Sequence, residues 1–188
     1  MGLFDKLLGK KNVEPLPTGS AAFIEAARLI SGDDREAASK VSYCMEHTKE
    51  YLETEGRPNR GLTKDVKGCE LCMFAMIDTL IDNGFAVEFD WKEEQDEILH
   101  GIRAVAQKLG LAFTPEPDYS FLDDNEDRDE LEPERVFTLV ALNIRSFHYR
   151  LACIDIGSDS YVICFLQHKD YDRCEKMLAG MKARLYSF

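Results

Sequence analysis

Residues 150–166 read RLACIDIGSDSYVICFL and contain the clearest structural signal in the chain. Two runs rich in β-branched and aromatic residues, 150–156 and 161–166, flank the polar break GSDS. Such residues favour strands, whereas Gly, Ser and Asp favour the tight turn between two paired strands. The stretch therefore predicts a β-hairpin.

A third strand is predicted at residues 85–91, which read FAVEFDW and alternate between apolar and polar side chains. Alternation of this kind is typical of a half-exposed strand, so we expect the apolar set, Trp91 included, to face the core. We expect this strand to join the hairpin in a small, mostly antiparallel sheet that helices cover on one face. The fold class that follows is α+β.

Helical periodicity predicts most of the remaining chain, beginning with a helical N-terminal third. The segment 134–147 fits both a helix and a strand, and Pro133 favours the helix because proline suits the first helical turn. Capping residues at the starts and Gly at several ends place the other helices. The expected helices are residues 20–30, 33–55, 63–83, 92–110, 134–147 and 171–185.

The domain organisation follows from the start of the chain. Residues 1–17 read as a short amphipathic segment followed by a linker with two prolines, and residues 18–188 as a single α+β domain. The first eleven residues could attach the protein to a membrane surface or to another protein, although so short a segment with few cations binds lipid weakly.

Composition indicates a soluble globular protein, with 45% hydrophobic and 31% charged residues. We find no apolar run near the roughly 20 residues that a membrane-spanning helix needs, and no secretory signal pattern at the N-terminus. Six cysteines stand among apolar neighbours, which favours reduced thiols. We therefore expect a cytoplasmic protein.

The net charge of −12 is unevenly distributed. Residues 116–134 hold ten acidic residues against Arg128 alone, a local charge of −9. Phosphate backbones need the opposite sign, so we expect no nucleic-acid partner. The acidity indicates either solubility or a surface for a basic protein partner.

One candidate metal site combines a CxxH and a CxxC pattern. Its zinc ligands would be Cys44, His47, Cys69 and Cys72. The alternative is that these cysteines pack in the core like small apolar residues, since structural CxxC ligands usually lie on tight turns and not within helices. Core packing is the favoured interpretation, and no cofactor is otherwise indicated.

Two acidic motifs form the second candidate site. Asp90 and Glu93 stand where the strand 85–91 meets the next helix, at the spacing of a capping box, and Asp155 and Asp159 stand in the hairpin turn. Each pair therefore has a structural explanation as well as a functional one. If the strands pair, the two motifs lie near each other, and we would look there first for function.

The motifs Asp90-Trp91-Lys92-Glu93 and Asp155-x-Gly157-x-Asp159-x-Tyr161 resemble the two signatures of an uncharacterised bacterial domain family, over residues 84–185. The resemblance implies an α+β fold with a helix before the hairpin, and it implies no activity. The candidate binding residues are Asp90, Trp91, Glu93, Asp155, Asp159 and Tyr161.

Familiar catalytic motifs are missing from the sequence, including GxGxxG, the Walker A loop, GxSxG and HExxH. We therefore expect a non-enzymatic protein-interaction module, with a basic partner in the manner of toxin-neutralising immunity proteins. The alternative is a metal-dependent hydrolase that uses the acidic residues at the strand ends.

Overall fold

The protein was analysed as a computed structural model, which describes residues 15–54 and 67–188. The predicted amphipathic segment at the N-terminus and the predicted start of a helix at Thr63 lie outside these ranges. The described α-helices are α1 Ser20–Ile30, α2 Arg35–Glu46, α3 Thr48–Glu53, α4 Gly68–Asp82, α5 Gln95–Lys108, α6 Pro133–Ile144 and α7 His168–Gly180. The strands are β1 Ala86–Asp90, β2 Tyr149–Asp155, β3 Ser160–Gln167 and β4 Arg184–Ser187.

The four strands form one antiparallel sheet in the order β1-β3-β2-β4. The predicted hairpin is the central pair, with Cys153 opposite Ile163. The third predicted strand joins it as expected, since Phe89 of β1 lies opposite Tyr161 of β3. The α+β class and the three predicted strands are thus confirmed.

The last helix was predicted to run to residue 185, and this prediction is wrong. α7 ends at Gly180, and its end is closed by the amide of Ala183, which donates to Leu178 O at 2.9 Å. Lys182 adopts a left-handed φ of 62°, which turns the chain back toward the sheet. Leu185, which fits the apolar face of a longer helix, is instead buried from strand β4.

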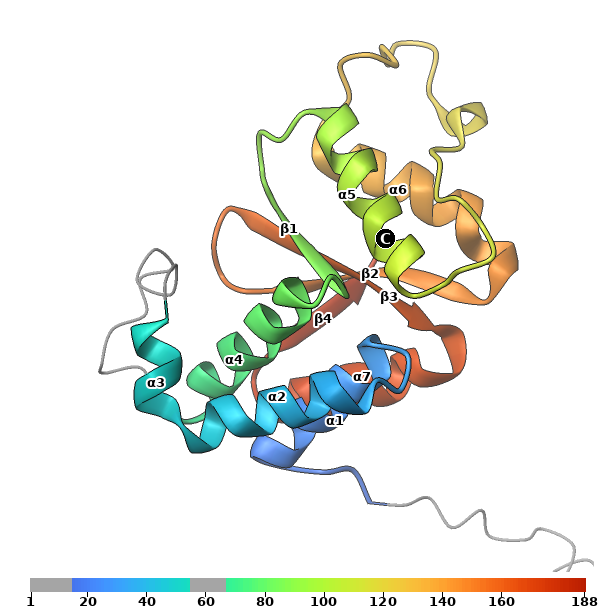
Figure 1. The fold of residues 1–188 in the computed structure, drawn as a ribbon. Coiled ribbons are helices and arrows are strands. Elements are labelled where there is room, and N and C mark those ends of the chain that lie inside the picture. Colours follow the sequence, from blue (N-terminus) through green and yellow to red (C-terminus); the bar gives the residue numbers. More distant parts are fainter. Residues whose placement is uncertain (1–14, 55–66) are drawn as a thin grey trace, which may run out of the picture.

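Helices cover both faces of the sheet, so the expectation of a single covered face is wrong. α1, α2, α4 and α7 pack on one face and α5 and α6 on the other (Figure 1). The cause lies in the two central strands, which are apolar on both faces. Ala152 and Ile154 face the first group of helices, whereas Leu151 and Cys153 face the second.

The strand β1 also touches both cores. Ala86 is buried in the first core and Phe89 in the second, so the expected division of β1 into a buried and an exposed face is only partly correct. Trp91, expected in the core, is 46% exposed. The strand ends at Asp90, and Trp91 belongs to the turn that follows, where strand alternation no longer directs the side chain.

The second predicted helix of the chain needs two corrections. The helix predicted at residues 33–55 is divided into α2 and α3 at His47, which leaves helical geometry with φ −113° and ψ 49°. Its cap is Asp34, whose side chain accepts from the amides of Glu36 and Ala37. Asp33, at which the predicted helix begins, lies before this cap and has a left-handed φ of 71°.

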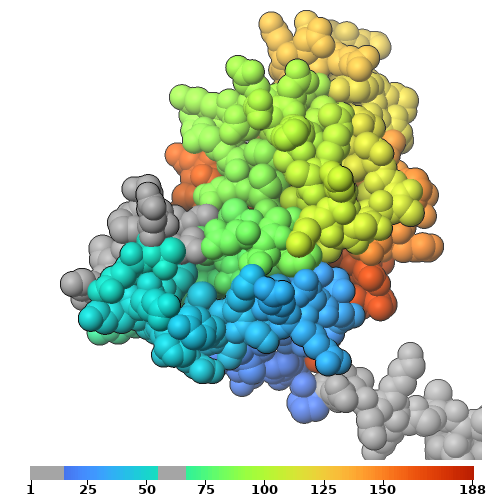
Figure 2. All heavy atoms as spheres, in the orientation of Figure 1, coloured from blue at the N-terminus to red at the C-terminus, as the bar shows by residue number. Residues whose placement is uncertain are grey.

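The ambiguous segment 134–147 is helical, as predicted. Pro133 stands in the first turn of α6, and a short 3-10 turn, Arg145–Phe147, follows the helix. Between α5 and α6 the acidic segment, drawn in yellow, lies over the α5–α6 side of the molecule (Figure 2). Among the described helices we find none that is both long enough and apolar enough to cross a membrane.

Candidate functional site

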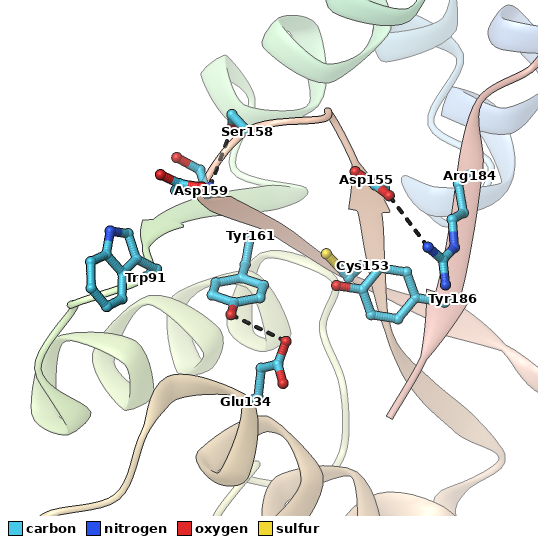
Figure 3. A pocket seen from close by; sticks show the side chains of 10 residues that line it. Trp91, Glu134, Cys153, Asp155, Ser158, Asp159, Tyr161, Arg184 and Tyr186 are labelled. Carbon is cyan, nitrogen blue, oxygen red and sulfur yellow. Dashed lines mark hydrogen bonds and ion pairs between the residues drawn. The ribbon is translucent and has the colours of Figure 1, made fainter.

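An open pocket of about 670 Å³ lies at the turn end of the hairpin and brings the two sequence motifs together (Figure 3). The pairing of β1 with β3 explains the convergence, because the amide of Trp91 donates to Asp159 O at 3.0 Å. We call this site the acidic pocket. Its lining residues are Trp91, Glu134, Cys153, Asp155, Ser158, Asp159, Ser160, Tyr161, Arg184 and Tyr186.

Three carboxylates give the acidic pocket its charge. Asp155 Oδ1 accepts from the amide of Gly157 at 2.8 Å, and Asp155 Oδ2 lies 3.8 Å from Arg184 Nη1. Glu134 accepts from the Tyr161 hydroxyl at 3.2 Å. Asp159 is exposed, and within residues 15–54 and 67–188 its carboxylate has no hydrogen bond or ion pair. One arginine therefore faces three carboxylates, which makes the pocket attractive to a cation.

The aromatic lining comes from three different elements. Tyr161 lies near the start of β3, Tyr186 lies on β4, and Trp91 directly follows β1 (Figure 3). The buried ring of Phe137 supports Tyr161 from below, edge to face at 5.3 Å between centroids. Burial, together with the nearby Glu134 carboxylate, raises the pKa of Tyr161. Tyr161 therefore remains a neutral hydrogen-bond donor at neutral pH.

Cys153 lies at the floor of the pocket but lacks the properties of a nucleophile. Only 1% of the residue is exposed, and burial raises the pKa of its thiol. Burial also raises the pKa of Tyr186, as does the hydrogen bond that its hydroxyl makes with the Cys153 sulfur. A reactive cysteine needs a lowered pKa and access to solvent, so Cys153 is a core residue and not a nucleophile.

The other two acidic candidates lie outside this pocket. Asp90 was expected to cap the following helix, and this expectation is wrong: its Oδ1 accepts from the amide of Lys92 at 2.9 Å, in a turn before the helix begins. The N-cap of α5 is Glu94, which makes no side-chain capping bond. Glu93 borders a separate depression that Asp96 and Asp129 also line.

Four of the six candidate binding residues therefore meet in one pocket: Trp91, Asp155, Asp159 and Tyr161. Sequence reasoning missed the other members of the lining. Glu134 stands in the first turn of α6, far from either motif in sequence, and its carboxylate could be placed only once α6 was docked on the sheet. Arg184 and Tyr186 lie on β4, a strand that the sequence does not predict, because the helix expected at residues 171–185 covers its first two residues.

The four zinc candidates are not assembled into a site. His47, at the end of α2, stacks on the Tyr43 ring with 3.9 Å between centroids, and its Nδ1 lies 3.0 Å from Tyr43 O. Cys44 and Cys72 pack against different apolar clusters, and Cys69 is exposed. In the part of the chain that the structure describes, no three His, Cys, Asp or Glu side chains are grouped to hold a metal ion.

Fold and pocket define an α+β domain with a four-stranded antiparallel sheet, covered by helices on both faces and carrying an acidic pocket at one end of its strands. Residues 22–188 match the family described as Domain of unknown function (DUF6630), and the chain belongs to this family. The match extends beyond residues 84–185, where the resemblance was seen, and includes the helical first third. No curated protein and no solved structure matches the chain.

Proposed function

We propose that this domain is a non-enzymatic protein-interaction module that binds a basic segment of a partner protein in the acidic pocket. The observation that supports the proposal most directly is the lining of that pocket. Glu134, Asp155 and Asp159 stand there with the exposed ring of Trp91, against the single cation of Arg184. Carboxylates combined with an aromatic face are the groups that recognise guanidinium and ammonium ions in proteins.

The surroundings of Trp91 favour a cation in particular. Its own neighbour, Lys92, places Nζ 4.4 Å from the centroid of the Trp91 ring. The ring therefore already makes a cation–π contact, which contributes about 0.5–1 kcal/mol at an exposed site. An arginine or lysine side chain of the partner would displace Lys92 from this ring, or use its other face, while its charged end reaches the carboxylates.

Long-range charge supports the same partner. The chain carries −12 overall, of which −9 lies in residues 116–134, which end at the pocket residue Glu134. A field of this sign raises the association rate of a basic protein and repels nucleic acid.

In its narrower form the proposal is a role like that of immunity proteins, which neutralise toxins by binding them. All six cysteines have free thiols, and reduced thiols are typical of cytoplasmic proteins. We therefore propose that the protein acts in the cytoplasm.

The hydrolase alternative receives less support from the same geometry. Its proposed carboxylates are divided between two depressions, with Asp155 and Asp159 in the acidic pocket and Glu93 in the other. Asp90 lines neither of the two and is engaged in its own turn. A hydrolytic site needs its acid, base and metal ligands around one reacting bond.

The test is the binding of a fluorescent arginine-rich peptide, measured by anisotropy at low and at high salt. We expect saturable binding that weakens as salt rises, and a loss of about tenfold, or about 1.4 kcal/mol, in the pocket variant Asp155→Asn/Asp159→Asn. Asparagine retains an acceptor for the amide of Gly157, so the turn should keep its shape. Trp91→Ala should weaken binding in the same assay.

The matched control is Asp124→Asn/Glu130→Gln, which changes the net charge equally. Both residues are exposed in the acidic segment and neither lines the pocket. The control should alter affinity by less than about twofold, since isolated surface charges contribute little. Equal losses in the two double variants, or no saturable binding to the wild type at low salt, would contradict the proposal.

A further inference from the structure

A second pocket, of about 300 Å³, lies at the opposite end of the strands and has the opposite charge. It is formed where β2 begins, beside the end of α6 and the start of α7. We call it the basic pocket. Its lining residues are Ala141, Arg145, Tyr149, Arg150, Leu151, His168, Ser187 and Phe188.

The charge of this lining stands out in a chain of net charge −12. Two guanidinium groups and an imidazole line the basic pocket, and none of its lining side chains is acidic. Within residues 15–54 and 67–188, neither Arg145 nor Arg150 takes part in an ion pair. By contrast, other arginines, including Arg103 and Arg135, are paired with glutamates. The guanidinium groups of Arg145 and Arg150 are therefore available to pair with an anionic ligand.

Arg150 is held in place before any ligand arrives. Its guanidinium carbon lies 4.5 Å from the centroid of the Tyr171 ring, and its Nη1 reaches Ser187 Oγ at 3.5 Å. Its Nε is buried and has no hydrogen-bond partner in the described part of the chain. A buried donor without an acceptor costs free energy, and an anion oxygen against this edge of the guanidinium would satisfy it.

Arg145 and His168 complete the polar side of the basic pocket. Arg145 is exposed at the end of α6, and no hydrogen bond or ion pair within the described ranges occupies its guanidinium. His168 is the first residue of α7, and its amide donates to His148 O at 2.9 Å, which fixes the start of that helix beside β2. Both side chains can donate hydrogen bonds to an oxyanion.

The other walls are apolar and limit the size of the ligand. Leu151 and Ala141 are buried, and the rings of Tyr149 and Phe188 form part of the remaining lining. A pocket of about 300 Å³ is at the lower end of the range for small-molecule sites. It has room for a charged group and a small organic remainder.

We propose that the basic pocket binds the phosphate group of a small anionic molecule, with Arg145 and Arg150 on the phosphate oxygens and the apolar walls against the rest of the ligand. Phosphate is favoured over carboxylate because it carries more charge and more acceptor oxygens for the two guanidinium groups. This inference is independent of the proposed protein partner, which uses the other end of the sheet.

The experiment is calorimetric titration of the full chain with inorganic phosphate, phenyl phosphate and acetate. We expect saturable binding of both phosphates at millimolar concentration or below, with phenyl phosphate the tighter because its ring contacts the apolar walls. Acetate should bind more weakly than either phosphate. No saturable binding of either phosphate, or acetate binding as tightly as they do, would overturn the proposal.

Variants locate the binding. Arg145→Gln, at an exposed side chain with no bond to lose, should lower phosphate affinity about tenfold. Arg150→Lys keeps the charge but loses the planar fork and should also weaken binding. The control is Lys169→Gln, which removes one charge beside His168 on α7 without touching the lining. If Lys169→Gln weakens binding as much as Arg145→Gln, the attraction is general and the assignment of the pocket is wrong.

Discussion

The acidic and basic pockets lie at opposite ends of the same sheet and differ in how their charges were brought together. In the acidic pocket, Asp155, Asp159 and Tyr161 come from one turn and its flanking strands, so a single stretch of sequence supplies much of the site. In the basic pocket, Arg145 and Arg150 stand five residues apart in two elements, and His168 joins them from a third element through packing. Sequence motifs therefore revealed the first pocket and gave no sign of the second.

Helix α6 runs from the acidic pocket to the basic pocket, and its dipole favours the sign of the charge at each end. Glu134, in its first turn, lines the acidic pocket, and Arg145, just after its last turn, lines the basic one. A helix favours negative side chains near its N-terminus and positive ones near its C-terminus, by about 0.3–1 kcal/mol each. The direction of α6 thus agrees with the sign of the charge at each end.

The largest effect is expected where the two pockets share a support. Phe137 is fully buried, and its ring lies 5.3 Å from Tyr161 in the acidic pocket and 5.1 Å from Phe188 in the basic one. Phe137→Ala should lower the free energy of unfolding by about 3–5 kcal/mol, measured by urea denaturation. It should also weaken binding of both the basic peptide and phosphate.

Phe121→Ala is the control for this prediction, because the chemical change is identical and Phe121 is 53% exposed. We expect it to change stability by no more than about 0.5 kcal/mol. Equal stabilities of the two variants would show that Phe137 does not support the pockets as described.

A smaller effect, which reaches the acidic pocket but not the basic one, is expected from a substitution at Gly101 in α5. A Cβ at this position would lie 2.7 Å from Phe89 Cζ and 3.1 Å from Val87 Cγ2, so the Phe89 ring, or β1 itself, must move away from α5. Gly101→Ala should lower stability by about 1–3 kcal/mol. Because Trp91 follows β1, peptide binding should weaken while phosphate binding is retained, which would separate the two pockets experimentally.

Gly180→Ala is the matched control, since a Cβ at this helical glycine meets nothing within 4 Å. It should leave stability unchanged or raise it by up to about 1 kcal/mol. A thermal unfolding scan of both variants decides the point. Gly101→Ala at wild-type stability would mean that the contact between α5 and β1 is looser than the structure indicates.

The smallest effect concerns the one cation within the acidic pocket. Arg184 has a 73% exposed side chain, and its ion pair with Asp155 is long, at 3.8 Å. Arg184→Gln should change stability by less than about 1 kcal/mol. Affinity for the basic peptide should rise by about two- to fivefold, because a competing charge is removed.

Arg128→Gln removes an equal charge from the acidic segment, outside the pocket, and is the control for Arg184→Gln. Anisotropy titrations of the two variants side by side measure the difference. An equal gain in both would attribute the effect to net charge, and a loss in Arg184→Gln would mean that Arg184 itself contacts the ligand.

The sequence was sufficient for three of the four strands and insufficient for β4. The hairpin and β1 were predicted because their residue types and turn leave few alternatives, and their pairing brought Trp91 near Asp159 as expected. β4 was missed because four residues are too few to show a period, and Leu185 suits a helix equally well. The second covered face was missed although the strands 150–156 and 161–166 are nearly continuous apolar runs.

The candidate site was predictable only in part for a similar reason. Local motifs identify groups that are close in sequence, such as Asp155 and Asp159. Glu134 and Arg184 reach the acidic pocket through tertiary packing, which depends on how α6 and β4 dock. The role of Asp90 was misjudged because capping-box spacing is also compatible with a turn that ends before the helix starts.

The strand order has a consequence for how the acidic pocket opens. β1 and β4 are the edges of the sheet, each hydrogen-bonded to one neighbour, and they are five and four residues long. Trp91 follows the first edge, and Arg184 and Tyr186 lie on the second, so two walls of the pocket belong to strands that are hydrogen-bonded to the sheet on one side only. A ligand that contacts both walls holds the edges against the central pair. A ligand bound in the acidic pocket would then slow amide hydrogen exchange along β1 and β4. It would also hinder strands of other chains from pairing with these edges.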